Sequence, residues 1–273
     1  MTIVLAILAG MPLGPVSTGQ GDDALGLQWN KVAEGAEWAV FQGELLGAPR
    51  SVSVFRCLLS DFKAEVASDP GRGKDLSAKT SGFARRYGAL AAINASYFNM
   101  KTLYPVTYVK DGGQVEGHTT ASELSRTDGI VRMKRHRVEI SFCDTLGYAR
   151  ATRRWPEAIA SGPVLIVDGK VRNGWPEGGF FTGSHPRSVV GTADGWLYLV
   201  VIDGRFPEAQ GTTIAETAQI CRLLGMKDAI NLDGGGSSAL WVSGPGVISH
   251  PSDNHTFDNR GERTVPNAII VHQ

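Results

Sequence analysis

The sequence predicts a mixed α/β fold of the α+β kind: a single domain whose twisted mixed β-sheet is flanked by helices, with the site at the carboxyl ends of strands. Three observations predict this class. The chain has 273 residues, of which 42% are hydrophobic, enough for one large domain with a real core. Apolar runs of strand length recur, and a well-capped helix lies between two of them. Glycine supplies 34 residues, which favours many turns over long helices.

The N-terminal half begins with strands. Residues 27–59 alternate between apolar and polar side chains, as paired strands with one buried face do. Residues 76–87 have a helical pattern, and we expect Gly88 to end that helix in the left-handed conformation. The apolar residues 90–93 then predict a buried strand that runs into a segment rich in amides.

The middle of the chain, residues 111–154, is polar and basic. Cations cluster there between short predicted strands: Arg132, Lys134, Arg135 and Arg137. A solvated hairpin or insertion is the favoured interpretation of this segment, and an anion-binding patch is the alternative.

The second half contains the clearest pattern. Residues 196–202 form a strand apolar enough to be covered on both faces, as parallel strands usually are. Thr213 and Glu216 form a capping box that starts a helix ending before Gly225, and residues 229–233 form the next strand. This order predicts two parallel neighbours joined by a right-handed crossover. Their carboxyl ends would share one edge of the sheet, where open sheets bind ligands.

Two acids and a glycine run belong to that edge. Asp203 follows the first strand, and Asp233 opens the segment Asp-Gly-Gly-Gly-Ser-Ser. Consecutive glycines allow successive N–H groups to turn toward one anion, although a hairpin turn explains the same run equally well. A dinucleotide fingerprint fails because a strand at 239–242 follows, not a helix. Ser237 as a nucleophile lacks the Gly-x-Ser-x-Gly elbow.

Other charged residues offer further candidates. Arg187, Arg205 and Arg263 lie in loops or beside glycines, and a guanidinium binds a phosphate with two parallel hydrogen bonds. Each of them alone is more often solvated or ion-paired. No cofactor is expected. A divalent cation, Ca²⁺ or Mg²⁺, held by Asp203 and Asp233 is the minority alternative.

Composition limits the partners and the location. Lys and Arg balance Asp and Glu, 27 to 27, so no overall basic field holds a nucleic acid. Residues 1–20 resemble a secretory signal without its basic start, which favours a periplasmic or secreted protein, and no segment is long enough to span a membrane. No linker divides residues 27–273, which we expect to form the domain. The three cysteines are expected to be buried thiols, and the oligomeric state is left open.

Six segments, in a fixed order, form a specific set. They are 92–99 (AINASYFN), 160–170 (ASGPVLIVDGK), 185–191 (HPRSVVG), 201–205 (VIDGR), 231–238 (NLDGGGSS) and 261–267 (GERTVPN). Together they resemble the phosphodiester glycosidase family, whose members include the lysosomal uncovering enzyme and bacterial envelope proteins. Ala95, Thr264 and Pro266 depart from the family pattern.

The resemblance implies a hydrolase that cleaves the bond between the anomeric carbon of a sugar and a phosphodiester. The sugar is expected to be of the N-acetylglucosamine type, and the substrate to be envelope or exopolysaccharide material. A phosphate ester leaves readily, so such an enzyme needs less general acid and more stabilisation of anionic oxygens than an ordinary glycosidase. The catalytic carboxylate is expected to be Asp233, with Asp203 second and Glu262 third. The expected substrate-binding residues are Asn94, Arg187, Arg205, Asn231, Gly234, Gly235, Gly236, Ser237, Arg263 and Asn267.

Roles divide among these residues. Arg187, Arg205 and the backbone of residues 234–236 would bind the phosphate, and the three asparagines would orient sugar hydroxyls or an acetamido group. Capping of strand ends is the alternative for Asn94 and Asn231. Two alternative functions remain: a carbohydrate-binding envelope protein without turnover on the same fold, and an ordinary glycoside hydrolase with paired carboxylates.

Overall fold

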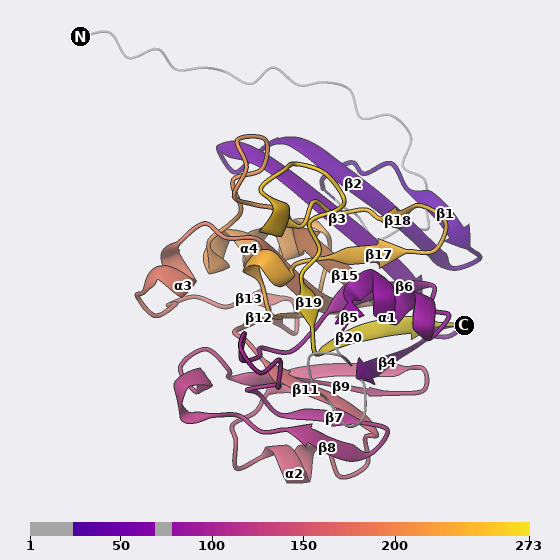
Figure 1. The fold of residues 1–273 in the computed structure, drawn as a ribbon, viewed down its shortest axis with the longest axis vertical. Coiled ribbons are helices and arrows are strands. Elements are labelled where there is room, and N and C mark those ends of the chain that lie inside the picture. Colours follow the sequence, from indigo (N-terminus) through magenta and orange to yellow (C-terminus); the bar gives the residue numbers. More distant parts are fainter. Residues whose placement is uncertain (1–23, 69–77) are drawn as a thin grey trace, which may run out of the picture.

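The computed structural model describes residues 24–68 and 78–273 (Figure 1). The signal-like segment 1–20 and the first residues of the predicted helix 76–87 lie outside the described residues. The predicted fold class is confirmed: the chain is built mostly of β-sheets, with a few helices around them. In place of one sheet, the strands form several sheets that share a core.

The largest sheet runs in the order β1-β2-β3-β15-β14-β16-β12-β13. Its strands are β1 (Asn30–Ala33), β2 (Ala36–Leu45), β3 (Ala48–Leu58), β15 (Trp196–Ile202), β14 (Arg187–Ala193), β16 (Asp228–Asn231), β12 (Val164–Val167) and β13 (Lys170–Val171). All neighbouring strands of this sheet are antiparallel.

The predicted pairing of β15 with β16 as parallel neighbours is wrong, because β14 lies between them. β14 and β15 form a hairpin whose two turn residues, Asp194 and Gly195, both have positive φ, as tight hairpins require. Helix α4 (Ile214–Leu223) then carries the chain past β14 to its free side. Both β15 and β16 are antiparallel to β14, so their carboxyl ends still share one edge.

Two five-stranded sheets and a short two-stranded one complete the fold. One runs β10 (Arg137–Phe142), β9 (Gly129–Lys134), β11 (Glu157–Ser161), β7 (Val109–Asp111) and β8 (Gln114–Gly117). The other runs β18 (Gly246–Val247), β17 (Leu240–Val242), β6 (Ala91–Asn94), β20 (Asn267–His272) and β4 (Lys63–Ser68). The short sheet pairs β19 (Thr264–Val265) with β5 (Ala78–Lys79). The predicted hairpin in the basic middle segment is confirmed as β9 and β10.

The helices are short. They are α1 (Thr80–Arg86), α2 (Tyr148–Ala151), α3 (Gly179–Thr182) and α4, with 3₁₀ turns η1 (Ala121–Glu123), η2 (Gly235–Ser237) and η3 (Ser252–Asn254). Helix α1 starts later than predicted because residues 78–79 pair with β19 instead. The capping box of Thr213 and Glu216 is confirmed at the start of α4, and Gly88 and Gly225 have the expected positive φ.

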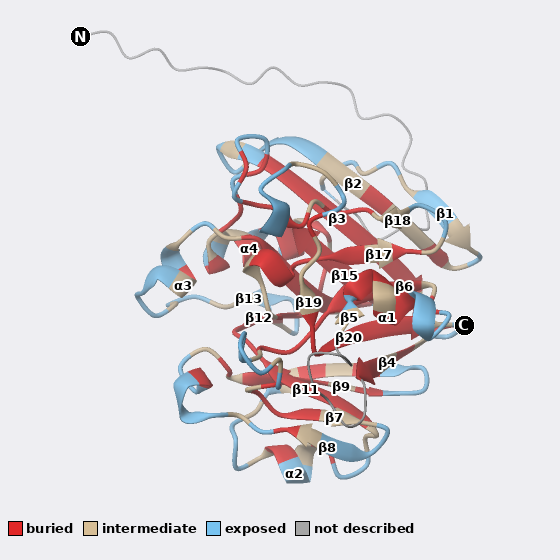
Figure 2. Ribbon diagram, viewed as in Figure 1, coloured by how far each residue is buried: buried red, intermediate tan, exposed pale blue. Residues whose placement is uncertain are grey.

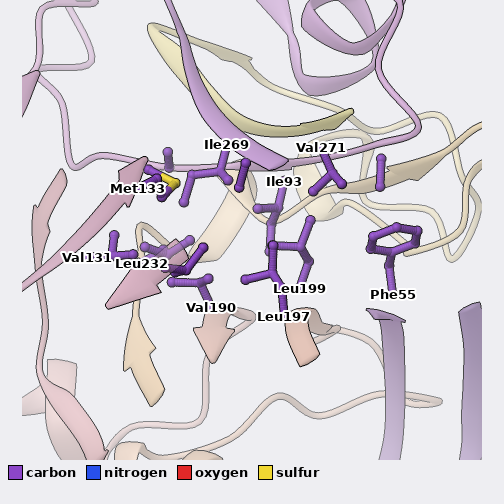
Figure 3. Packing of buried hydrophobic residues seen from close by; sticks show 14 of the residues in the cluster. Phe55, Ile93, Val131, Met133, Val190, Leu197, Leu199, Leu232, Ile269 and Val271 are labelled. Atoms are coloured by element: carbon purple, nitrogen blue, oxygen red, sulfur yellow. The ribbon is translucent and has the colours of Figure 1, made fainter. Parts of the chain in front are cut away.

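The core lies where the three larger sheets meet. Val131 and Met133 of β9, Ile93 of β6 and Leu197 of β15 belong to one buried cluster (Figure 3). Figure 2 shows the continuous buried layer that results. A second cluster joins the apolar stripe of α4 to the largest sheet. All three cysteines are free: Cys57 and Cys221 are buried as predicted, whereas Cys143 is partly exposed. None of the described helices is long and apolar enough to cross a membrane.

Candidate active site

One edge of the largest sheet brings predicted residues together. Arg187 starts β14 opposite Ile202, the last residue of β15, and Asp233 follows the end of β16. A pocket of about 300 Å³ opens beside this edge. It is lined by Tyr97, Arg126, Phe180, His185, Pro186, Arg187, Arg205, Asp233, Gly234 and Gly235. The pocket thus unites the first-choice acid, two predicted arginines and part of the glycine run.

Asp233 is partly exposed in this pocket, and its main-chain N–H donates to Ala95 O at 3.0 Å. Burial of the carboxyl group by surrounding protein raises its pKa to about 6, although the Ser237 hydroxyl and the charges of Arg126 and Arg263 act in the opposite direction. Among the described residues that line the pocket, Asp233 is the one carboxylate. The site therefore offers a single acid that changes charge close to neutral pH.

The glycine run serves close packing. A Cβ on Gly234 would lie 2.7 Å from Pro186 O, and a Cβ on Gly236 would overlap the Asp253 carboxylate. The N–H of Gly235 donates to Pro186 O at 2.9 Å, so it is already used within the protein. The structure thus explains these glycines by approach of neighbouring atoms, and they form the short turn η2 instead of a symmetric anion nest.

Arg187 is almost fully buried and bonds mainly to backbone. Its Nε donates to Thr212 O at 2.9 Å, and its Nη2 donates to Phe180 O at 2.8 Å and Gly183 O at 3.1 Å. Burial lowers its pKa to about 10. These bonds fix the segment that contains α3, which carries Phe180 into the wall of the pocket.

Arg205 is exposed and lies over the glycine run. Its Nη1 donates to Ser252 Oγ at 3.3 Å, and its Nη2 lies 2.9 Å from the position that a Cβ on Gly235 would occupy. Its backbone φ of 74° is a conformation that costs a residue other than glycine roughly 1 to 2 kcal/mol. Strain of this kind clusters at functional sites. Arg205 is thus a cation held at the mouth of the pocket.

Sequence reasoning missed five of the lining residues, which are Tyr97, Arg126, Phe180, His185 and Pro186. The guanidinium of Arg126 lies 4.2 Å from the ring centroid of Tyr97 and 5.2 Å from that of Phe180, and its Nε donates to Glu123 at 2.6 Å. Tyr97 lies inside the segment 92–99, and its membership of that segment could have identified it as a site residue. Arg126 comes from the turn before β9 and Phe180 from the short helix α3, and neither lies in a recognisable motif, so only the fold reveals them.

Asp203 lies at the same edge but is not among the residues lining the pocket. Its buried carboxylate accepts from Ser51 Oγ at 2.7 Å, from His250 N at 2.8 Å and from His250 Nδ1 at 2.8 Å. The His250 ring also stacks on Phe257, with the ring centroids 3.9 Å apart. Asp203 therefore fixes the loop after β18 to the edge of the sheet.

The three predicted asparagines are buried and use their amides inside the protein. Asn94 donates to Asp233 O at 2.7 Å and accepts from Ser188 Oγ at 2.7 Å. Asn231 donates to Tyr97 OH at 3.0 Å. Asn267 accepts from the N–H of Ser96 and donates to its hydroxyl. None of the three lines the pocket. For Asn94 and Asn231, these bonds support the strand-end alternative over direct contact with a sugar.

Glu262, Arg263 and Ser237 are not among the residues that line the pocket. Glu262 accepts from the N–H and the hydroxyl of Ser81 at 2.8 and 2.6 Å, which caps the start of α1. Arg263 forms a two-point ion pair with Asp253, at 2.6 and 2.7 Å. Ser237 is buried next to the glycines. Within residues 24–68 and 78–273, no group of three or more His, Cys, Asp or Glu is arranged to hold a metal ion.

Residues 87–272 match the model of a family described as phosphodiester glycosidase. Two relatives match over 90 residues: the N-acetylglucosamine-1-phosphodiester alpha-N-acetylglucosaminidase of Mus musculus is 39% identical to this chain there, and the Bos taurus protein of the same name is 38% identical. This stretch is 32% of the present chain, but it spans only 17% and 16% of those two proteins.

Solved structures extend the likeness to the whole fold. The zebrafish N-acetylglucosamine-1-phosphodiester alpha-N-acetylglucosaminidase catalytic domain, auto-inhibited by its pro-peptide, has a TM-score of 0.68 at 18% identity, over 88% of this chain and 84% of that chain. A hypothetical protein from Synechocystis has a TM-score of 0.64 at 18% identity, over 91% and 64%. A Burkholderia pseudomallei protein named as exported has a TM-score of 0.60 at 17% identity, over 85% and 75%.

Proposed function

This chain belongs to the phosphodiester glycosidase family, and we propose on that premise that it hydrolyses the glycosidic bond of a sugar 1-phosphodiester of the N-acetylglucosamine type. The observation that carries the proposal is the composition of the pocket. It combines one carboxylate, Asp233, with the cations Arg126 and Arg205. A glycosidase for neutral substrates needs a second carboxylic acid to protonate the leaving oxygen. A phosphodiester leaves as a stable anion and needs cations instead.

Arg126 and Arg205 are the groups that would bind the phosphate oxygens. Both line the pocket, and each keeps guanidinium N–H groups beyond the bonds to Glu123 and Ser252. Charged hydrogen bonds of this kind contribute roughly 1.5 to 3 kcal/mol each in a protected site. Developing negative charge on the leaving phosphate would thus be stabilised as the glycosidic bond breaks.

Asp233 would act on the opposite side of that bond. In its ionised form the carboxylate stabilises the positive charge that develops at the anomeric carbon, and it either attacks that carbon or takes a proton from the attacking water. The other groups act by positioning. Arg187 holds α3 and therefore Phe180, and Asn94 holds the main chain of Asp233.

The natural substrate is proposed to be envelope or exopolysaccharide material, met outside the cytoplasm. Two observations support this context: the signal-like residues 1–20 and the fold shared with a bacterial protein named as exported. Phosphodiester-linked sugars in such polymers would supply the anionic leaving group that the arginines of the pocket are proposed to stabilise. A cation at Asp203 is not part of the proposal, since both oxygens of that carboxylate already accept hydrogen bonds.

Hydrolysis in ¹⁸O-labelled water tests the reaction directly. With the methyl phosphodiester of N-acetylglucosamine 1-phosphate, cleavage of the C–O bond yields free sugar carrying the label and unlabelled methyl phosphate. Label in the phosphate would identify a phosphodiesterase and overturn the proposal. Saturable binding without turnover would favour the carbohydrate-binding alternative. Equal cleavage of a neutral aryl glycoside would favour the ordinary glycosidase.

A further inference from the structure

The sheet that contains β9 and β10 carries positive charge that the pocket does not use. Residues 129–155 include seven Lys or Arg but only two Asp or Glu, although the whole chain has a net charge of zero. The remainder of the chain is correspondingly negative. Five of these arginines surround one tryptophan and define what we call the basic face: Arg132, Arg137, Arg150, Arg153 and Arg154 around Trp155.

Trp155 and Arg132 join two segments of the chain into this face. The guanidinium carbons of Arg132 and Arg137, both on the hairpin, lie 5.4 and 5.5 Å from the Trp155 ring centroid. Arg132 Nη1 also donates to Ala151 O at 3.2 Å, which ties the hairpin to the end of α2. Arg132 therefore ties the hairpin to α2, which carries Arg150 and precedes Arg153 and Arg154; α2 and β9 lie in the lower part of the molecule in Figure 1.

Three of the cations are available to a ligand. Arg150, Arg153 and Arg154 are exposed, and their side chains make no hydrogen bond or ion pair within the part of the chain that the structure describes. They line a hollow of about 630 Å³ together with Trp155. Like charges this close repel one another, so the face favours a partner that supplies several negative charges at once.

A neighbouring hollow adds groups suited to sugars. It has a volume of about 320 Å³ and meets the first hollow at Ala149, on helix α2. Its lining includes the exposed His118 and Thr145, and it is backed by Tyr108 and Tyr148, which are almost fully buried. Aromatic rings and hydroxyl groups are the usual means of binding a sugar's C–H faces and hydroxyls. The two hollows thus adjoin at Ala149 of α2, and we call them together the trough.

We propose that this trough binds an anionic glycan chain, at a site that shares no lining residue with the pocket of Asp233. The proposal extends the proposed function, since the phosphodiester-linked glycan that the pocket would cleave is itself a polyanion. The face is small, and the rest of the chain carries net negative charge. A slender flexible glycan therefore fits better than a stiff nucleic-acid duplex, which needs a wide basic surface.

Binding to dextran sulfate, an anionic glycan without a cleavable phosphodiester, tests the site by titration calorimetry at two salt concentrations. The variant Arg150→Ala/Arg153→Ala/Arg154→Ala should bind about tenfold more weakly than the unmodified protein, with a smaller salt dependence. A matched control, Lys31→Ala/Lys170→Ala/Arg222→Ala, removes the same charge from exposed positions elsewhere. It should stay within about twofold.

Three results would overturn the proposal: equal weakening in both triple variants, equally tight binding of uncharged dextran, or a short DNA duplex binding as tightly as dextran sulfate. Hydrolysis of a small sugar 1-phosphodiester is measured on the same proteins and should not change in either variant. A protein that binds dextran sulfate through the basic face but hydrolyses nothing would refute the proposed function and leave this site standing.

Discussion

At the scale of single residues, the surroundings of Asp233 in the pocket oppose the ionisation of its carboxyl group. Burial holds the pKa of Asp233 at about 6, so the carboxylate is ionised at neutral pH in surroundings that favour its neutral form. Arg126 and Arg263 reduce this cost because their charges act on the same group. A carboxyl group that is charged despite partial burial is typical of a reacting group, because a neutral Asn or Gln could fill a purely structural role at the same position.

Replacing Asp233 by Asn should lower kcat and kcat/KM together, by about 10² to 10⁴-fold. The amide has the same shape but cannot carry the charge. The variant should also be more stable than the unmodified protein at pH 7.5, by up to about 2 kcal/mol, because it has no buried charge. Normal kinetics together with a changed thermal midpoint would assign Asp233 a structural role instead.

The pH profile provides a second check at this scale. The pKa of Asp233 is raised from 3.8 to about 6 in the folded protein. If the ionised form reacts, kcat/KM should be level above pH 6 and should fall about tenfold per pH unit below it. The stability gain of Asp233→Asn has the same origin: it should be present above pH 6 and vanish as the pH falls toward 4. Activity that rises below pH 6 would make Asp233 a general acid.

At the scale of elements, the four-residue helix α3 shows how a wall of the pocket is fixed. An isolated helix of this length is unstable in water, so its position depends on tertiary contacts. Arg187 supplies them through the carbonyls of Phe180, within α3, and of Gly183, which directly follows it, and the His185 ring lies 3.0 Å from Gly179 O. The arginine expected to bind phosphate thus acts on the substrate through Phe180.

Two conservative variants separate anchoring from phosphate binding. Arg187→Lys loses the planar fork that reaches Thr212 and Phe180 together, so its thermal midpoint should fall by about 2 to 6 °C and KM should rise. Arg205→Lys should keep its thermal midpoint and lose kcat/KM for the phosphodiester. Differential scanning fluorimetry and steady-state kinetics measure both. Unchanged kinetics in Arg205→Lys would remove Arg205 from the phosphate site.

At the scale of the whole molecule, the three larger sheets depend on one another. Their shared cluster contains residues from each sheet (Figure 3). The pocket has the same composite origin: Arg126 precedes β9, Tyr97 follows β6, and Asp233 follows β16. Activity should therefore be lost when any one of the sheets unfolds.

Met133→Ala tests that dependence from a position outside the pocket. Met133 is fully buried on β9, so the truncation should cost about 2 to 5 kcal/mol. Tryptophan fluorescence and residual activity should both decline at the same, lower urea concentration. Loss of the β9 sheet in a separate transition, with activity retained, would show that the sheets unfold independently.

Local pattern alone predicted much of this protein. The apolar runs identified β6, β15, β16 and β17, the capping box identified α4, and the acid after β16 was the leading candidate for the site. These features depend on residues close together in sequence, where periodicity and turn chemistry act directly. Residues 185–191 were interpreted as a motif and not as a strand, and this is why β14 was missed between β15 and β16.

Tertiary structure decided what each side chain faces. Arg126 and Phe180 joined the site because the turn before β9 and helix α3 converge at the pocket. Arg187, Asn94 and Glu262 turned inward to carbonyls and N–H groups of distant segments. Hydrogen-bond partners of buried polar groups are chosen by packing across the whole chain. The sequence determined which groups the protein can bring to an edge of its sheet, and only the packing of the sheets decided which of them a substrate can reach.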